Sequence, residues 1–127
     1  MPRTPDQRPP VAIGHVFLRA SDVAAATEWL TTAGLRRIAG GKSFAVLELR
    51  GGTHLVVTKA ARPPKKGTEA PFDLMVDDVD AARRAYAKHG FKPTRIKRGT
   101  IHDRFTVAGP DGYRFEIVSS HAGKRPV

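Results

Sequence analysis

Apolar and polar residues alternate along several short stretches of this chain, with the period of two that is typical of half-buried strands. The last such stretch is residues 113–118, where Tyr, Phe and Ile alternate with Arg, Glu and Val. The preceding Pro-Asp-Gly sequence is typical of a tight turn. Burying a lone carboxylate is costly, so Glu116 must be solvated, paired or bound to a cation. We therefore expect its face of the strand to border a cavity or solvent rather than a packed core.

The same pattern predicts seven further strands and two helices. Capping residues and glycines set the expected helix ends: Ser21 or Asp22 begins the first helix, which Gly34 ends, and the second runs from Asp78 to His89. A Gly-Gly pair at 51–52 predicts a two-residue hairpin, and the Pro- and Lys-rich residues 60–70 predict a linker. The further strands are expected at 11–19, 35–39, 43–50, 53–58, 72–76, 91–97 and 101–108.

The predicted elements occur twice in the same order, strand-helix-strand-strand-strand. Asp22 and Asp78 are 56 residues apart, as are Gly34 and Gly90. Such a repeat predicts two tandem βαβββ modules, at about 11–59 and 70–119, within one α+β domain spanning 11–121. Neither module can bury its sheet alone, so the two are expected to pack together. Residues 1–10 and 122–127 are expected to be disordered tails.

Composition narrows the classes of function. The 127 residues include no cysteine, which excludes disulfides, thiolate metal sites and cysteine nucleophiles. The lack of a long apolar run and the polar segment 1–10 predict a soluble, cytoplasmic protein with no membrane contact. The net charge of +10 raises the possibility of nucleic-acid binding. Much of that charge lies in the tails and in residues 59–66, and no predicted helix carries a basic stripe with aromatic residues, so nucleic acid is the weakest of the alternatives.

Three segments together resemble a known family. They are His15-Val-Phe-Leu followed by Asp22, then Asp77-Asp78-Val-Asp, and finally the sequence 109–118 with its Pro-Asp-Gly turn. The chain resembles the vicinal oxygen chelate superfamily over residues 11–119, a group that includes glyoxalase I, fosfomycin- and bleomycin-resistance proteins and extradiol dioxygenases. The resemblance implies paired βαβββ modules whose curved sheets enclose a cavity, with the helices outside. It also implies a small-molecule ligand and a homodimer.

In metal-using members of that family, the ligands come from the first and fourth strands of each module. His15 and Glu116 match two of these positions. The repeat register places Pro71 and Val56 at the other two, and neither side chain can bind a cation. The resemblance therefore implies an incomplete metal set.

Two outcomes remain open at this point. A shifted site that adds His54, His102 or Asp73 to the two retained ligands would suit Zn²⁺, Mn²⁺, Fe²⁺ or Ni²⁺. Alternatively, His15 and Glu116 hydrogen-bond each other or a ligand without a metal.

Strand parity places further side chains on the expected cavity face. Cations beside apolar walls suggest a small anionic or carbonyl-bearing ligand, because guanidinium groups bind carboxylate and phosphate well. The alternative is that the same arginines extend out of the cavity mouth into solvent. The candidate ligand-binding residues are Phe17, Arg19, Met75, Arg104 and Arg114.

Three functions follow as hypotheses. The first is a metal-dependent lyase, isomerase or dioxygenase of the glyoxalase type, in which Glu116, His54 and His102 are the candidate catalytic residues and the two histidines supply the acid or base. The second is a metal-free protein that binds or sequesters its ligand, as bleomycin-resistance proteins do. The third is a basic domain that binds nucleic acid.

Overall fold

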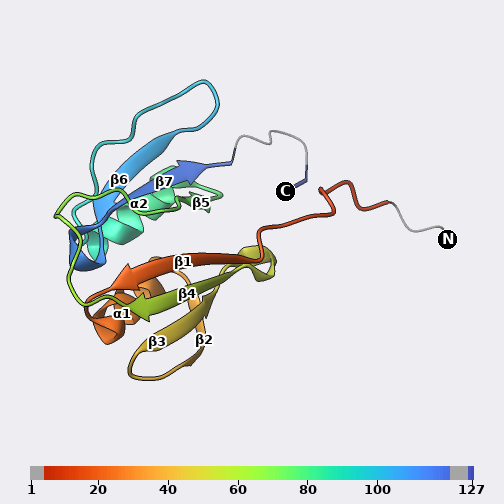
Figure 1. Ribbon diagram of the computed structural model, residues 1–127. Helices are drawn as coiled ribbons and strands as arrows, with labels where there is room; N and C mark the ends of the chain where they lie inside the picture. The colour runs from red at the N-terminus through yellow and green to blue at the C-terminus, as the bar shows by residue number, and fades with distance from the viewer. Residues whose placement is uncertain (1–4, 121–125) are drawn as a thin grey trace.

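The computed structural model describes residues 5–120 and 126–127, and it contains two helices and two sheets (Figure 1). The first sheet has four strands in the order β1-β4-β3-β2, and the second has three in the order β5-β7-β6. This arrangement confirms the predicted α+β class. The expected tails lie partly outside the described residues; residues 5–10 are exposed and form no helix or strand.

The first module contains all five predicted elements. They are β1 (His15–Ala20), α1 (Val23–Ala33), β2 (Arg36–Gly40), β3 (Phe44–Glu48) and β4 (His54–Lys59). Strand β1 pairs in parallel with β4, whereas β3 is antiparallel to both β4 and β2. The parallel pairing requires a long crossover between β1 and β4, and α1 with the β2–β3 hairpin supplies it.

The second module contains β5 (Leu74–Val76), α2 (Val79–Lys88), β6 (Arg104–Ala108) and β7 (Arg114–Ser119). The strand predicted at 91–97 is wrong. Pro93 has no N–H for a ladder, and Lys92 has a φ of +56°, which extended backbone does not allow. The segment still follows β6, because Thr94 and Lys97 donate backbone hydrogen bonds to the carbonyls of Thr106 and Arg104.

The helix starts predicted from sequence are confirmed. Asp22 and Asp78 are the N-caps, and each side chain accepts a hydrogen bond of 3.0 Å from the backbone N–H three residues later. Gly34 ends α1 with a φ of +122°, a backbone conformation that residues with a side chain rarely adopt. Helix α2 ends one residue before the predicted His89, which is its C-cap.

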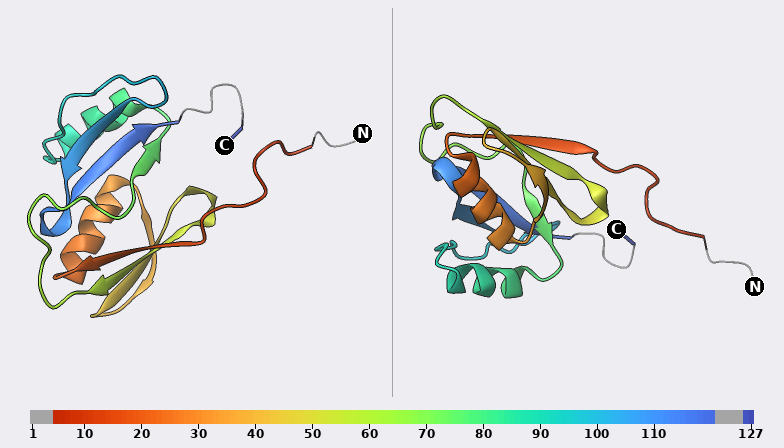
Figure 2. Two further views of the ribbon diagram at one scale, coloured as in Figure 1. Left: turned by 45° about the horizontal axis from the view of Figure 1, so that its top comes forward. Right: turned by 90° about the horizontal axis from the view of Figure 1, so that it is seen from below.

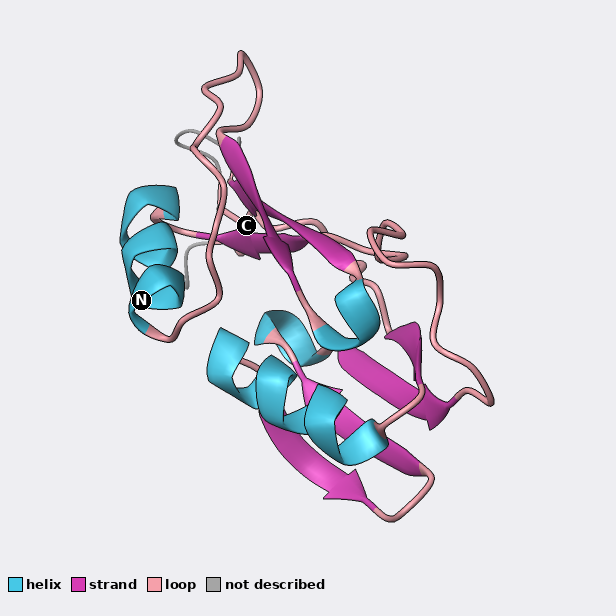
Figure 3. Cartoon of the chain, turned by 90° about the vertical axis from the view of Figure 1, so that its left-hand side faces the viewer, coloured by secondary structure: helices cyan, strands magenta, loops and turns pink. Residues whose placement is uncertain are grey.

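Helix α1 lies between the two sheets and joins the modules in one core (Figures 2 and 3). Its Trp29 stacks on Phe91 and Phe115 of the second module, with ring centroids 4.8 and 5.0 Å apart. The Tyr86 hydroxyl of α2 donates a 2.8 Å hydrogen bond to the carbonyl of Ala33 at the end of α1. The two modules thus share one core, in which α1 contacts both.

The predicted Pro-Asp-Gly turn forms and connects the modules. Residues Pro110–Gly112 make one short 3₁₀ turn, in which Asp111 has a φ of +57°. The Asp111 carboxylate accepts hydrogen bonds from the Ser21 backbone N–H at 2.7 Å and from its hydroxyl at 2.5 Å. Neither helix in the described part of the chain is long and apolar enough to cross a membrane.

Candidate functional site

The four-stranded sheet has one buried and one open face. On β1, Leu18 and Ala20 are buried in the core, whereas His15, Phe17 and Arg19 alternate with them and are exposed. This is the parity expected from sequence. We call the side that carries these three residues the open face of the first module.

A row of three polar side chains crosses the open face. His15 and His54 are direct partners in the β1–β4 register, and Glu48 is the partner of His54 in the β3–β4 register. The two imidazole rings lie edge to face with centroids 5.6 Å apart. The His54 Nε2 lies 3.2 Å from a Glu48 carboxylate oxygen. The structure therefore joins two of the predicted site residues and adds a carboxylate.

Glu48 was not predicted, and the reason is the length of one turn. The predicted two-residue Gly51-Gly52 hairpin would place Leu49 opposite His54. Instead, residues 49–53 form a longer loop that contains the 3₁₀ turn Arg50–Gly52, closed by a 2.8 Å hydrogen bond from the Leu49 N–H to the Thr53 carbonyl. The register moves by one residue, which places Glu48 opposite His54.

Glu48 is held as an anion. The guanidinium of Arg36, its partner on β2, donates to one carboxylate oxygen, and His54 lies at the other. These two hydrogen bonds, that of Arg36 first, lower the pKa of Glu48 below its ordinary value of 4.5. Because the carboxylate can only accept, the neutral His54 ring carries its hydrogen on Nε2.

Below this row the open face becomes apolar and then cationic. Phe17 pairs with Val56, and Arg19 pairs with Thr58. Phe17 is 59% exposed. The Arg19 side chain makes no ion pair or hydrogen bond with another described residue. Val56 thus forms part of an apolar patch.

The second module also has an open face, and two ion pairs lie on it. Glu116 accepts a hydrogen bond of 3.1 Å from Arg104, and Arg114 lies 3.9 Å from Glu69. Met75 on β5 is 44% exposed. A pocket of about 430 Å³ lies beside Glu116 and is lined by Glu69, Ala70, Pro71, Phe72 and Asp73.

The structure does not bring all the predicted site residues together. His102 lies outside the strand predicted to carry it, since β6 begins at Arg104. Its Nδ1 is 2.5 Å from the Ser119 carbonyl at the end of β7. Among the described residues, no hydrogen bond or ion pair joins His15 to Glu116.

The described part of the chain contains no group of three His, Cys, Asp or Glu side chains arranged to hold a metal ion. Two of the candidate carboxylates also have other partners. Glu48 and Glu116 are both paired with arginines, and a cation would have to displace each guanidinium. The residues therefore do not form a ready metal centre within one chain.

Several solved structures share this fold. The structure of a lactoylglutathione lyase from Agrobacterium tumefaciens superposes with a TM-score of 0.73 at 18% identity, covering 92% of this chain and 99% of that one. A possible glyoxalase from Bacillus cereus gives a TM-score of 0.65 at 26% identity, with coverages of 84% and 96%. A glyoxalase/bleomycin resistance protein/dioxygenase from Nocardioides gives 0.69 at 20% identity, with coverages of 94% and 89%. No curated protein matches the sequence.

The family itself is shown by the sequence. Residues 12–117 match one family model, which spans both modules and includes His15 and Glu116. The resemblance seen in the residues is thereby confirmed. The chain belongs to the Glyoxalase/Bleomycin resistance protein/Dioxygenase superfamily.

Proposed function

We propose that this chain is a small-molecule-binding protein whose ligand, an anionic or carbonyl-bearing molecule, lies on the open face of the first module. The observation that carries the proposal is the side-chain set of β1. Arg19 has no ion-pair partner among the described residues, Phe17 is 59% exposed, and His15 lies against His54. A free guanidinium beside an apolar ring and polar imidazoles is a typical set of contacts for a small organic anion.

The proposed binding does not depend on a metal. Two of the carboxylates that could join a cation are already paired with arginines, Glu116 with Arg104 and Glu48 with Arg36. Arg19, His15 and His54 can contact a ligand directly through hydrogen bonds and charge. The protein then resembles the metal-free binding members of its family in mechanism.

The proposal includes a homodimer. In one chain, the open faces of the two modules expose large apolar side chains, including Phe17, Phe44 and Met75. A second copy that lies over these faces would supply the opposing wall of the ligand site and bury the apolar side chains. Burial of such side chains stabilises association.

One observation favours a second candidate, a divalent-metal-dependent lyase, isomerase or dioxygenase. His15 and His54 lie side by side, and paired imidazoles suit Zn²⁺, Mn²⁺, Fe²⁺ or Ni²⁺. In the dimer, Glu116 of another copy could join them once Arg104 moves away. Such an ion would polarise substrate oxygens.

Thermal unfolding of the full chain separates the two candidates. Small carboxylates such as lactate and pyruvate, in the presence of chelator, are expected to raise the melting temperature of wild type but not of Arg19→Gln. At a hundredfold excess over Kd the stabilisation is about 2.7 kcal/mol. A shift produced by the metal ions instead, and lost in both His15→Ala and Glu116→Gln, would establish the second candidate. A lack of response to every carboxylate would refute the proposed ligand class.

A further inference from the structure

The strand register arranges the open face of the first module in three successive rows. The rows follow from direct pairing across β1, β4 and β3, and they repeat every second residue because side chains alternate between faces. The first row is His15, His54 and Glu48; the second is Phe17, Val56 and Val46; the third is Arg19, Thr58 and Phe44.

The first row presents a proton acceptor. Glu48 accepts from Nε2 of His54, so the lone pair of the neutral ring is on Nδ1. No described residue makes a hydrogen bond to that Nδ1. A ligand group that hydrogen-bonds to this nitrogen must therefore donate an O–H or N–H.

The second row has no polar side chain. Val46 and Val56 are half-buried, and Phe17, which lies in register with them, is mostly exposed. Ligand atoms over this row gain from leaving water only if they are apolar. A polar group placed there would lose its hydration without a partner.

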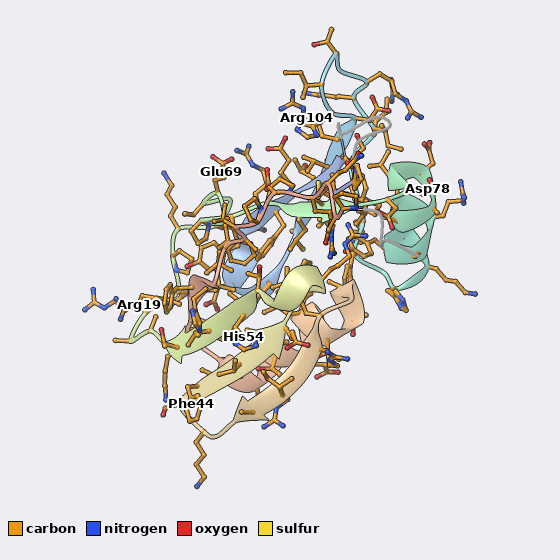
Figure 4. All side chains as sticks on the ribbon, turned by 90° about the vertical axis from the view of Figure 1, so that its right-hand side faces the viewer. Arg19, Phe44, His54, Glu69, Asp78 and Arg104 are labelled. Atoms are coloured by element: carbon orange, nitrogen blue, oxygen red, sulfur yellow. The ribbon has the colours of Figure 1, made fainter. Side chains whose placement is uncertain are left out.

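The third row supplies positive charge at the far end of the face. Arg19 and Phe44 lie toward one end of the sheet and His54 further along it (Figure 4). Four residues of strand separate Arg19 from His15, which is about 13 Å at 3.3 Å per residue. Thr58 adds a hydroxyl beside the guanidinium.

We infer that these three rows form an extended ligand platform, which selects an elongated molecule with a proton donor at one end, an apolar middle and an anionic group about 13 Å away. The inference rests on the proposed function, since it specifies the ligand of the same face. It assigns Glu48 a positioning role, because Glu48 determines which nitrogen of His54 carries the hydrogen. It assigns specificity for ligand length to Arg19.

Calorimetric titration with matched probes tests the platform. The main probe is ω-hydroxydecanoate, whose hydroxyl and carboxylate match the row spacing when the chain is extended. The controls are ω-hydroxybutyrate, which is too short, and ω-methoxydecanoate, which has the length but no donor. We expect the main probe to bind wild type at least tenfold more tightly than either control, as the loss of a hydrogen bond to a charged or fixed group predicts.

Two variants then test the individual rows. Arg19→Gln is expected to weaken ω-hydroxydecanoate at least tenfold, whereas Arg84→Gln, an exposed arginine on α2, leaves it unchanged. In Glu48→Gln the amide oxygen turns to Arg36, which only donates, and the amide NH₂ faces His54. The His54 hydrogen then moves to Nδ1, which long-range ¹⁵N–¹H NMR detects, and the preference for hydroxyl over methoxy is lost.

The outcomes separate this inference from the proposed function. If lactate and ω-hydroxydecanoate bind equally well, the proposed function stands and the platform is refuted. If Glu48→Gln leaves the His54 tautomer and the hydroxyl preference as in wild type, the positioning role of Glu48 is refuted. If no carboxylate binds while Phe17→Ser dissociates a dimer, the face is a contact between copies of the chain, and both proposals fail.

Discussion

Trp29 is the side chain whose removal we expect to weaken the joint between the modules most clearly. It projects from α1 of the first module and stacks on Phe91 and Phe115 of the second, at 4.8 and 5.0 Å between centroids. Each aromatic pair contributes about 0.5–1.5 kcal/mol beyond its buried area. A Trp→Ala substitution in a packed site typically costs about 3–5 kcal/mol, and because Trp29 is only half-buried the lower end applies. We therefore expect Trp29→Ala to lower the free energy of unfolding by about 3 kcal/mol.

Urea unfolding followed by far-UV circular dichroism measures this loss, at a fixed protein concentration so that any dimer contributes equally. Trp29→Phe keeps a ring in the stack and should cost about 1 kcal/mol. Glu28→Ala changes the exposed neighbouring residue and should stay within about 0.5 kcal/mol. A loss below about 1 kcal/mol for Trp29→Ala would show that the modules do not depend on this stack.

Two further predictions concern other tertiary contacts. Asp111→Ala removes both acceptors of Ser21 and should destabilise the fold by about 1–3 kcal/mol in the same assay, whereas Asp6→Ala in the exposed N-terminal segment should have no effect. The Asp80 and Asp103 carboxylates, whose pKa values Arg98 lowers below the ordinary 3.8, stabilise the fold above that value and lose the effect as the pH falls through their folded-state pKa. The stability difference between wild type and Arg98→Gln should therefore be constant from pH 7 to 5, shrink only as the pH falls below the ordinary pKa of 3.8, and disappear once the pH is below the folded-state pKa values; a difference that already declines between pH 7 and 5 would contradict this account.

Most of the fold could be predicted from the sequence because its signals are local. The N-caps Asp22 and Asp78, the positive-φ Gly34 and the alternation on each strand depend on neighbouring residues alone. The internal repeat then supplied the order of the elements. Where a local signal conflicted with the repeat, the local signal prevailed: Pro93 keeps residues 91–97 out of the sheet although the first module has a strand at the corresponding place.

The candidate site was harder to predict because it depends on register. Parity alone correctly placed His15, Phe17 and Arg19 on one face. The partner of His54 depended on whether the hairpin loop has two residues or five, and a Gly-Gly pair fits both lengths. His102 shows the same limit, since three residues fewer in β6 place its ring at the Ser119 carbonyl instead of on the strand face.

Val56 lies at the centre of the three rows of the open face. A carboxylate at this position would repel the anionic ligand that we propose for Arg19, but it would attract a cation. With valine there, Phe17 and Val46 extend an apolar strip between the imidazole row and the arginine row. The substitution Val56→Glu should therefore change the two kinds of binding in opposite directions. It should weaken the binding of ω-hydroxydecanoate and create affinity for Zn²⁺ beside His15 and His54. If the variant binds ω-hydroxydecanoate as wild type does and does not bind Zn²⁺, while its unfolding remains cooperative, the open face is not the ligand site.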